Sequence, residues 1–235
     1  MIVIGEKING AIPKVAKAIE ARDEAFIRGL ALNQAKFGAS YIEVCASTSP
    51  SVERETLAWL MDIVQDAVDT PLSVDSSDPK VIVDVLPRAK KPGIINSASD
   101  EGGKCELIFP AIADTGWNVI ALTCDDGGLP TDPAVKISIA RTIVGKAKGY
   151  GIPVERLFID PLVNSIATVG QTLTSFVEAT RGIKAEFPGI HVNSGLSNVS
   201  FGMPLRKTIN QTFLILAMGA GMDCAIMDPT SQDMR

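Results

Sequence analysis

Four carboxyl or amide side chains lie where short apolar runs of the sequence end. Asp75 follows the run LSV, Asn96 follows GII, Asp160 follows LFI, and Asn198 comes shortly after HVN. Carboxylate oxygens accept parallel N–H bonds from a guanidine-like edge, and an Asn amide offers both an acceptor and donors. This set of residues predicts a polar site for a neutral ring rich in N–H groups. A pterin has such an edge, and purines and guanidino compounds also fit.

Each of these residues also fits a structural role, as a helix cap or as part of a turn. Asp78 is the better cap for the helix that begins at Pro79, which leaves Asp75 free. Asp160 precedes Pro161, which fits an ordinary turn. A ligand site is favoured because all four residues come just after predicted strands.

The elements that position these residues alternate between β-rich apolar runs and longer amphipathic runs. Predicted strands are Ile2–Ile4, Tyr41–Val44, Leu72–Val74, Gly93–Ile95, Val119–Leu122, Leu157–Ile159, His191–Asn193 and Asp223–Ile226. Predicted helices are Glu24–Phe37, Val52–Val68, Pro79–Ala89, Lys104–Asp114, Pro133–Gly149, Leu173–Glu186 and Leu205–Met218. The alternation predicts parallel βαβ units in one α/β domain over residues 1–235, a TIM (β/α)8 barrel.

Chemistry in such a barrel lies at the carboxyl ends of the strands, where Asn9 also falls. No GxGxxG turn follows the first strand, which argues against a dinucleotide-binding fold. Only MDPTSQDMR follows the last predicted strand, so the eighth helix is expected to be missing or truncated. If another subunit covers that side, the protein is a dimer.

Composition narrows the possible partners. The chain has 46% hydrophobic residues, 21% charged residues and a net charge of −5, which disfavours nucleic acid and anionic membrane surfaces. The start MIVIGEKING lacks a basic leader, so a cytoplasmic location is expected.

The four cysteines are widely spaced with no CxxC pair, and the single histidine, His191, begins a predicted strand. We therefore expect no metal site and no Ser-His-Asp triad.

Several segments together resemble the pterin-binding methyltransferases. They are GEKING, VDSSDPKVI, INSAS, FIDPL, GLSNVSFGMP and INQTFLILAMGAGMDCAIMDP, in this order along the chain. The sequence is similar to methyltetrahydrofolate:corrinoid/iron-sulfur protein methyltransferases, to their relatives in anaerobic demethylation systems, and to the folate domain of cobalamin-dependent methionine synthase. The resemblance implies a homodimeric TIM barrel that binds tetrahydrofolate or 5-methyltetrahydrofolate as substrate, with the corrinoid carried by a partner protein.

The resemblance also implies roles for individual residues. Asp75, Asn96 and Asp160 would hold the pterin ring, and Asn198 would contact N5, the nitrogen that carries the methyl group. Gly195 and Ser197 would line the same pocket. Asn9 is also expected to bind the substrate, because it lies just past the first predicted strand. The stretch IEVCAS departs from the pattern, because Glu43 and Cys45 stand where the family commonly has Asp-x-Asn.

The implied reaction moves a methyl group between N5 of tetrahydrofolate and the cobalt of a corrinoid. An Asn amide can polarise or orient N5 but cannot supply a proton. We expect transfer from methylcorrinoid to tetrahydrofolate, in a demethylation pathway. The alternatives are the opposite direction in the acetyl-CoA pathway, a dihydropteroate synthase-like enzyme, a barrel aldolase that uses Lys7, and a non-catalytic folate binder.

Overall fold

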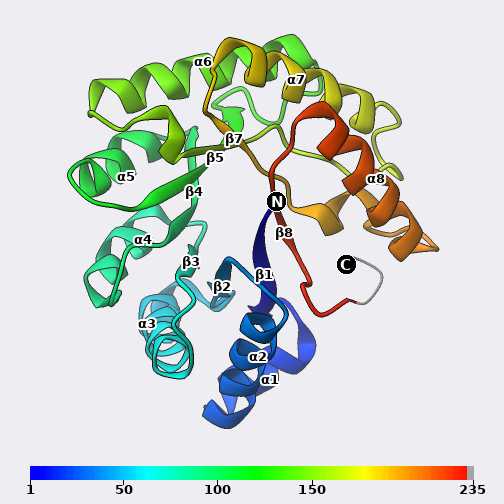
Figure 1. Cartoon of the computed structure of the whole chain (residues 1–235). Coiled ribbons are helices and arrows are strands. Elements are labelled where there is room, and N and C mark those ends of the chain that lie inside the picture. The colour runs from blue at the N-terminus through cyan, green and yellow to red at the C-terminus, as the bar shows by residue number, and fades with distance from the viewer. Residues whose placement is uncertain (232–235) are drawn as a thin grey trace. The chain divides into compact units, whose positions relative to one another are not determined.

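The computed structural model describes residues 1–231, in which strands and helices alternate along the chain (Figure 1). The strands are β1 (Ile2–Asn9), β2 (Tyr41–Cys45), β3 (Leu72–Asp75), β4 (Ile94–Asp100), β5 (Asn118–Asp125), β6 (Leu157–Asp160), β7 (His191–Val192) and β8 (Cys224–Met227). They form one sheet in the order β7-β6-β5-β4-β3-β2-β1-β8. Consecutive parallel strands with β8 beside β1 are the strand order of a (β/α)8-barrel, which confirms the predicted fold class.

The helices follow the strands as crossover connections. They are α1 (Pro13–Glu20), α2 (Glu24–Lys36), α3 (Pro50–Ala67), α4 (Pro79–Val85), α5 (Lys104–Ile112), α6 (Pro133–Gly149), α7 (Thr172–Glu186) and α8 (Arg206–Ala220), with short 3-10 turns η1 (Leu86–Arg88), η2 (Val154–Arg156) and η3 (Leu196–Ser200). Asp78 caps α4 by accepting a backbone N–H bond at 2.9 Å, as predicted, and Asp132 caps α6 in the same way at 2.8 Å. No helix within residues 1–231 is long and apolar enough to cross a membrane.

Several strand ends lie beyond the predicted ones. Asp75, Asn96 and Asp160 were expected just past their strands, but each lies within its strand and has a partner in the parallel ladder. The apolar pattern stops earlier because side chains at the carboxyl ends are polar, whereas backbone pairing does not depend on side-chain polarity.

The helices differ from the prediction in two places: one helix was not predicted, and one predicted helix end is wrong. The segment Pro13–Glu20 forms a separate helix, α1, which is divided from α2 by Arg22 at a φ of 51°. The predicted helix end at Met218 is wrong, because α8 continues to Ala220 and is capped by Gly221, where φ is 116°. Only glycine reaches that conformation without strain, so this glycine ends the helix. The described residues after β8, Asp228–Ser231, do not form a helix.

The chain forms two compact units. The N-terminal unit comprises Ile2–Ser97, Thr115–Asn118 and the residues from Asp228, and the C-terminal unit comprises Met1, Ala98–Asp114 and Val119–Met227. That residues 1–235 are a single domain stays a prediction.

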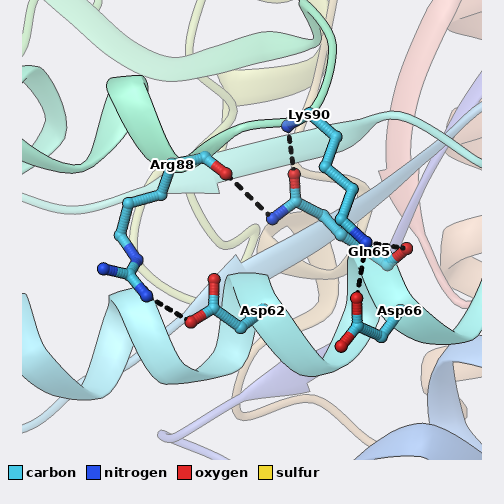
Figure 2. A network of polar contacts seen from close by, with 5 residues as sticks. All are labelled: Asp62, Gln65, Asp66, Arg88 and Lys90. Atoms are coloured by element: carbon cyan, nitrogen blue, oxygen red, sulfur yellow. Dashed lines mark hydrogen bonds and ion pairs between the residues drawn. The ribbon is translucent and has the colours of Figure 1, made fainter.

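A surface network in the N-terminal unit fastens the segment before β4 to α3 (Figure 2). Gln65 accepts from the Lys90 backbone N–H at 2.6 Å and donates to the Arg88 carbonyl at 3.3 Å. Ion pairs join Arg88 to Asp62 and Lys90 to Asp66. These pairs are exposed and contribute little each. Their effect is to hold the chain that leads into β4, the strand that carries Asn96.

In the C-terminal unit, the short strand β7 is fixed by charged contacts. Asp223 accepts from the Val192 backbone N–H at 2.9 Å and pairs with Lys184 Nζ at 2.8 Å and with His191 Nδ1 at 3.1 Å. The His191 ring also stacks on Phe158, with the ring centroids 4.4 Å apart. These contacts account for His191 as a structural residue at the start of its strand. An isolated parallel bridge joins Gly195 to Ile226 of β8.

Candidate active site

Four polar side chains form one row across the N-terminal unit. Asn9 is the ladder partner of Cys45, Cys45 of Asp75, and Asp75 of Asn96. Residues that pair in register project to the same face of a sheet, so neighbours in this row lie side by side. All four are partly exposed. The structure therefore brings Asn9, Asp75 and Asn96 together, while their role in binding a ligand stays a prediction.

Asn96 is held by a buried carboxyl group that belongs to β2. Its Nδ2 donates to Glu43 Oε1 at 2.9 Å, and Glu43 is only 3% exposed. Burial raises the pKa of Glu43 well above its ordinary value, and the charge of Asp75 raises it further. Sequence reasoning noted Glu43 only as a departure from the family pattern. The signal that could have singled it out is an acidic residue between Ile42 and Val44, inside a buried strand.

The pKa of Asp75 is shifted by burial and by neighbouring groups. Burial raises the pKa of Asp75 to about 6, the Cys45 thiol opposes this through a hydrogen bond, and the charge of Glu53 adds to the rise. Burial and the Asp75 charge also raise the pKa of Cys45, so its sulfur is a thiol that donates to the carboxylate. Cys45 Sγ lies 3.2 Å from Ser47 Oγ, and this hydroxyl donates to Asn9 Oδ1 at 3.2 Å. The row is thus linked from Asn9 to Asp75.

Asp160, at the end of β6 in the C-terminal unit, is 5% exposed. Its Oδ1 accepts from the Leu162 N–H at 2.9 Å, its Oδ2 accepts from Asn193 Nδ2 at 3.0 Å, and the Gly195 N–H also bonds to the carboxylate. Burial nevertheless raises the pKa of Asp160 to about 6. Asn193 was predicted only as a strand residue, yet it is fully buried and holds this carboxylate. Within residues 1–231 neither Asn193 Oδ1 nor the adjacent Ser194 Oγ has a hydrogen-bond partner.

A buried lysine supports the turn after Asp160. Lys136, on α6, is 1% exposed, and its Nζ donates to the Leu162 carbonyl at 2.9 Å. Leu162 has a φ of 55°, which costs energy for a residue other than glycine. Burial lowers the pKa of Lys136 to about 8, while the charge of Asp160 acts in the opposite direction. Lys136 thus stabilises the strained turn whose N–H holds the Asp160 carboxylate.

Asn198 lies in the 3-10 turn η3 rather than in a plain loop. Its side chain is exposed, and no described residue forms a hydrogen bond with its amide. The amide folds back over Gly195, where an added Cβ would lie 2.9 Å from Asn198 Nδ2. Arg206 holds the turn by donating to the Ser197 carbonyl at 3.0 Å and to Ser200 Oγ at 3.1 Å. The predicted set Gly195, Ser197 and Asn198 therefore forms one turn, and Gly195 connects it to Asp160.

Two further features bear on the possible chemistry. Lys7 Nζ pairs with Asp228 Oδ2 at 3.1 Å in the N-terminal unit, which argues against a free amine that forms Schiff bases. In the described part of the chain, no group of three His, Cys, Asp or Glu side chains is arranged to hold a metal ion. What remains are carboxylates and amides, which suit hydrogen bonding to a heterocycle.

These side chains at the strand ends of a (β/α)8-barrel fit the class of enzymes that bind pterins. A family model described as "Pterin binding enzyme" matches residues 14–228, and the chain belongs to this family. It is 50% identical over its whole length to the methylcorrinoid:tetrahydrofolate methyltransferase of Eubacterium limosum, of which it covers 87%. It is also 28% identical to the methionine synthase of Mycobacterium tuberculosis over 97% of this chain, which spans 20% of that much longer protein.

Solved structures agree on the fold. Dihydropteroate synthase of Xanthomonas albilineans in complex with 7,8-dihydropteroate superposes with a TM-score of 0.68 at 19% identity, over 99% of this chain and 90% of that one. The enzyme of Coxiella burnetii in complex with pteroic acid gives 0.71 at 15% identity, over 99% of this chain and 90% of that one. At these identities the likeness shows the barrel fold alone.

Proposed function

We propose that this chain transfers a methyl group from a methylated corrinoid protein to N5 of tetrahydrofolate. The observation that carries the proposal is the 50% identity, over the whole chain, to a protein named for that reaction. The carboxylates and amides of Asp75, Asn96, Asp160 and Asn198 are hydrogen-bonding groups of the kind that a pterin needs. In this reaction the corrinoid is a substrate that a partner protein brings to the enzyme.

We assign the binding groups by residue. The Asp75 carboxylate and the Asn96 amide bind N–H groups of the pterin ring, and the Asp160 carboxylate binds the ring as well. Asn198 contacts N5 and is the catalytic residue. The remaining proposed contacts to the folate are made by Gly195, Ser197 and Asn9.

The electron balance of the transfer is simple. The N5 lone pair attacks the methyl carbon, the N–C bond forms as the Co–C bond breaks, and both electrons of that bond stay on cobalt, which becomes cob(I). The proton of the former N5–H then leaves to solvent, because an amide cannot accept it at neutral pH. The Asn198 carbonyl accepts a hydrogen bond from that N5–H and so directs the lone pair at the methyl carbon. The rate enhancement comes from orienting the two reactants, tetrahydrofolate and the methylated corrinoid.

A spectroscopic assay tests this function. Methylcob(III)alamin, or a methylated corrinoid protein, is mixed with tetrahydrofolate and the purified chain, and the absorbance of cob(I) is followed. We expect cob(I) and 5-methyltetrahydrofolate to appear in equal amounts. If the chain binds tetrahydrofolate but transfers no methyl group to or from a corrinoid, it is a folate-binding protein and not a methyltransferase.

The contact between Gly195 and Asn198 gives a first prediction. The variant Gly195→Ala should transfer methyl groups about tenfold more slowly, because the new Cβ displaces the amide by more than a catalytic geometry tolerates. Initial rates of cob(I) formation measure this. Gly29→Ala is the matched control, since its Cβ would meet no atom within 4 Å. Equal rates for both variants and the parent would remove the Gly195 contact from the mechanism.

A second prediction concerns pH. Asp75 and Asp160 both have pKa values of about 6, and the ionised carboxylates are the forms that accept N–H bonds from the ring. Affinity for tetrahydrofolate should therefore be constant at higher pH and fall as the pH drops through about 6, by up to about tenfold per pH unit for each carboxyl. Calorimetric titrations between pH 5 and 8 check this. An affinity that rises towards low pH contradicts the assignment.

We also propose that the chain forms a homodimer through α8. Ile215 is 69% exposed on this helix, and Leu216 and Met218 are each 46% exposed, an apolar surface that water disfavours. Sedimentation equilibrium decides the matter, because a mass of one chain at micromolar concentration would exclude the dimer.

A further inference from the structure

Asn96 and Glu43 form a hydrogen-bonded pair although 53 positions separate them in sequence. Asn96 lies on β4 and Glu43 on β2, with β3 between the two strands. The bond runs from Asn96 Nδ2 to Glu43 Oε1 and is 2.9 Å long. The pair therefore spans three neighbouring strands of the N-terminal unit and fixes which end of the Asn96 amide faces inward.

Glu43 does not bond to its ladder partner on the neighbouring strand β3. Its ladder partner is Ser73, whose buried hydroxyl has no hydrogen bond within residues 1–231, so Glu43 does not bond to it. The charged groups that face Glu43 are Asp75 on β3 and Glu6 on β1, and both are acidic. Burial and Asp75 raise the pKa of Glu43 well above its ordinary value. Protonated or not, the carboxyl group keeps an oxygen that accepts from an NH2 group.

An Asn amide has one carbonyl oxygen and one NH2 group, on opposite sides of the same carbon. If Glu43 holds the NH2 group, the carbonyl oxygen points away from Glu43, on a residue that is partly exposed. We propose that Glu43 is a positioning residue which presents Asn96 Oδ1 to the ligand as an acceptor. The inference rests on the proposed function, because it takes the pterin ring as the ligand of Asn96.

The consequence is a rule for ligand recognition. Asp75 is the ladder partner of Asn96, so this orientation places an amide acceptor beside a carboxylate acceptor. Adjacent acceptors match a ring edge with adjacent N–H donors, such as the 2-amino group and ring N–H of a pterin. A ring that offers a carbonyl at that position would leave acceptors facing each other, and unpaired polar groups of this kind lower affinity strongly.

Two variants of Glu43 separate this role from simple packing. Glu43→Met fills similar volume without an acceptor, and we expect about tenfold weaker binding of tetrahydrofolate in calorimetry. Glu43→Gln keeps an oxygen that can accept from Asn96 and loses only the ionisable group, so affinity should stay within about threefold of the parent. Thermal unfolding of both variants checks that each is folded. If Glu43→Met is unfolded, Glu43→Asp replaces it, because the shorter side chain withdraws the carboxyl from Asn96 and should weaken binding similarly.

A double-mutant cycle completes the test. Asn96→Ala alone should weaken binding about tenfold or more, and Glu43→Met combined with Asn96→Ala should be no weaker than Asn96→Ala alone. Wild-type affinity in Glu43→Met, or losses that add in the double variant, would overturn the positioning role. Failure of the parent protein to bind tetrahydrofolate would instead overturn the proposed function, so the two failures are distinguishable.

Discussion

Replacing Asn198 by alanine should slow methyl transfer about 10²-fold or more, while tetrahydrofolate binding weakens only modestly. The expectation follows from the place of this side chain. Its amide is exposed and has no hydrogen-bond partner among the described residues, so it contributes little to the fold and is free to contact a ligand. The hydrogen bond from N5–H to Asn198 strengthens as N5 gains positive charge during methyl transfer, so its loss affects the rate more than the affinity.

Three measurements test this expectation: the rate of cob(I) formation, the dissociation constant of tetrahydrofolate, and the unfolding temperature. Only the first should change substantially. Asn33→Ala is the matched control, because Asn33 is an exposed asparagine of α2. Unchanged turnover in Asn198→Ala would exclude Asn198 from the reaction. A loss of folate binding as large as the loss of rate would make it a binding residue instead.

The sequence was sufficient to predict the residues that lie at the strand ends. Asp75, Asn96 and Asp160 could be found because each ends an apolar run, and a parallel barrel places such positions at one end of its strands. Their partners could not be found in this way. Glu43 meets Asn96 only because β2, β3 and β4 are paired in one particular register, and Asn193 meets Asp160 only because β7 lies beside β6.

The electrostatic character of the site also depends on contacts between distant segments. Asp75 and Asp160 are ordinary aspartates in sequence, and their raised pKa values result from burial among neighbours on other strands. From the sequence, Lys136 is expected to be an exposed polar residue of an amphipathic helix. In the structure it is buried against the turn at Leu162. Hydrophobic periodicity identifies elements and faces, whereas such contacts require the register and the connecting turns.

Asp75→Asn should weaken tetrahydrofolate binding about 10²-fold and leave the fold intact. Two hydrogen bonds to a charged acceptor are each worth about 1.5–3 kcal/mol, and the amide replaces one acceptor oxygen by an NH2 group that faces N–H donors. The variant removes a carboxylate that burial disfavours, so the unfolding temperature should stay the same or rise. Calorimetry gives the affinity, and thermal unfolding gives the stability.

The control for this variant lies three residues further along the chain. Asp78→Asn changes an exposed residue that caps α4, and asparagine caps a helix as well as aspartate does. Its folate affinity and stability should therefore match those of the parent. Parent-like affinity in Asp75→Asn would show that the ring does not bind to this carboxylate. The row from Asn9 to Asn96 would then be a structural feature of the sheet, and the pterin would have to be held by the Asp160 group of the C-terminal unit.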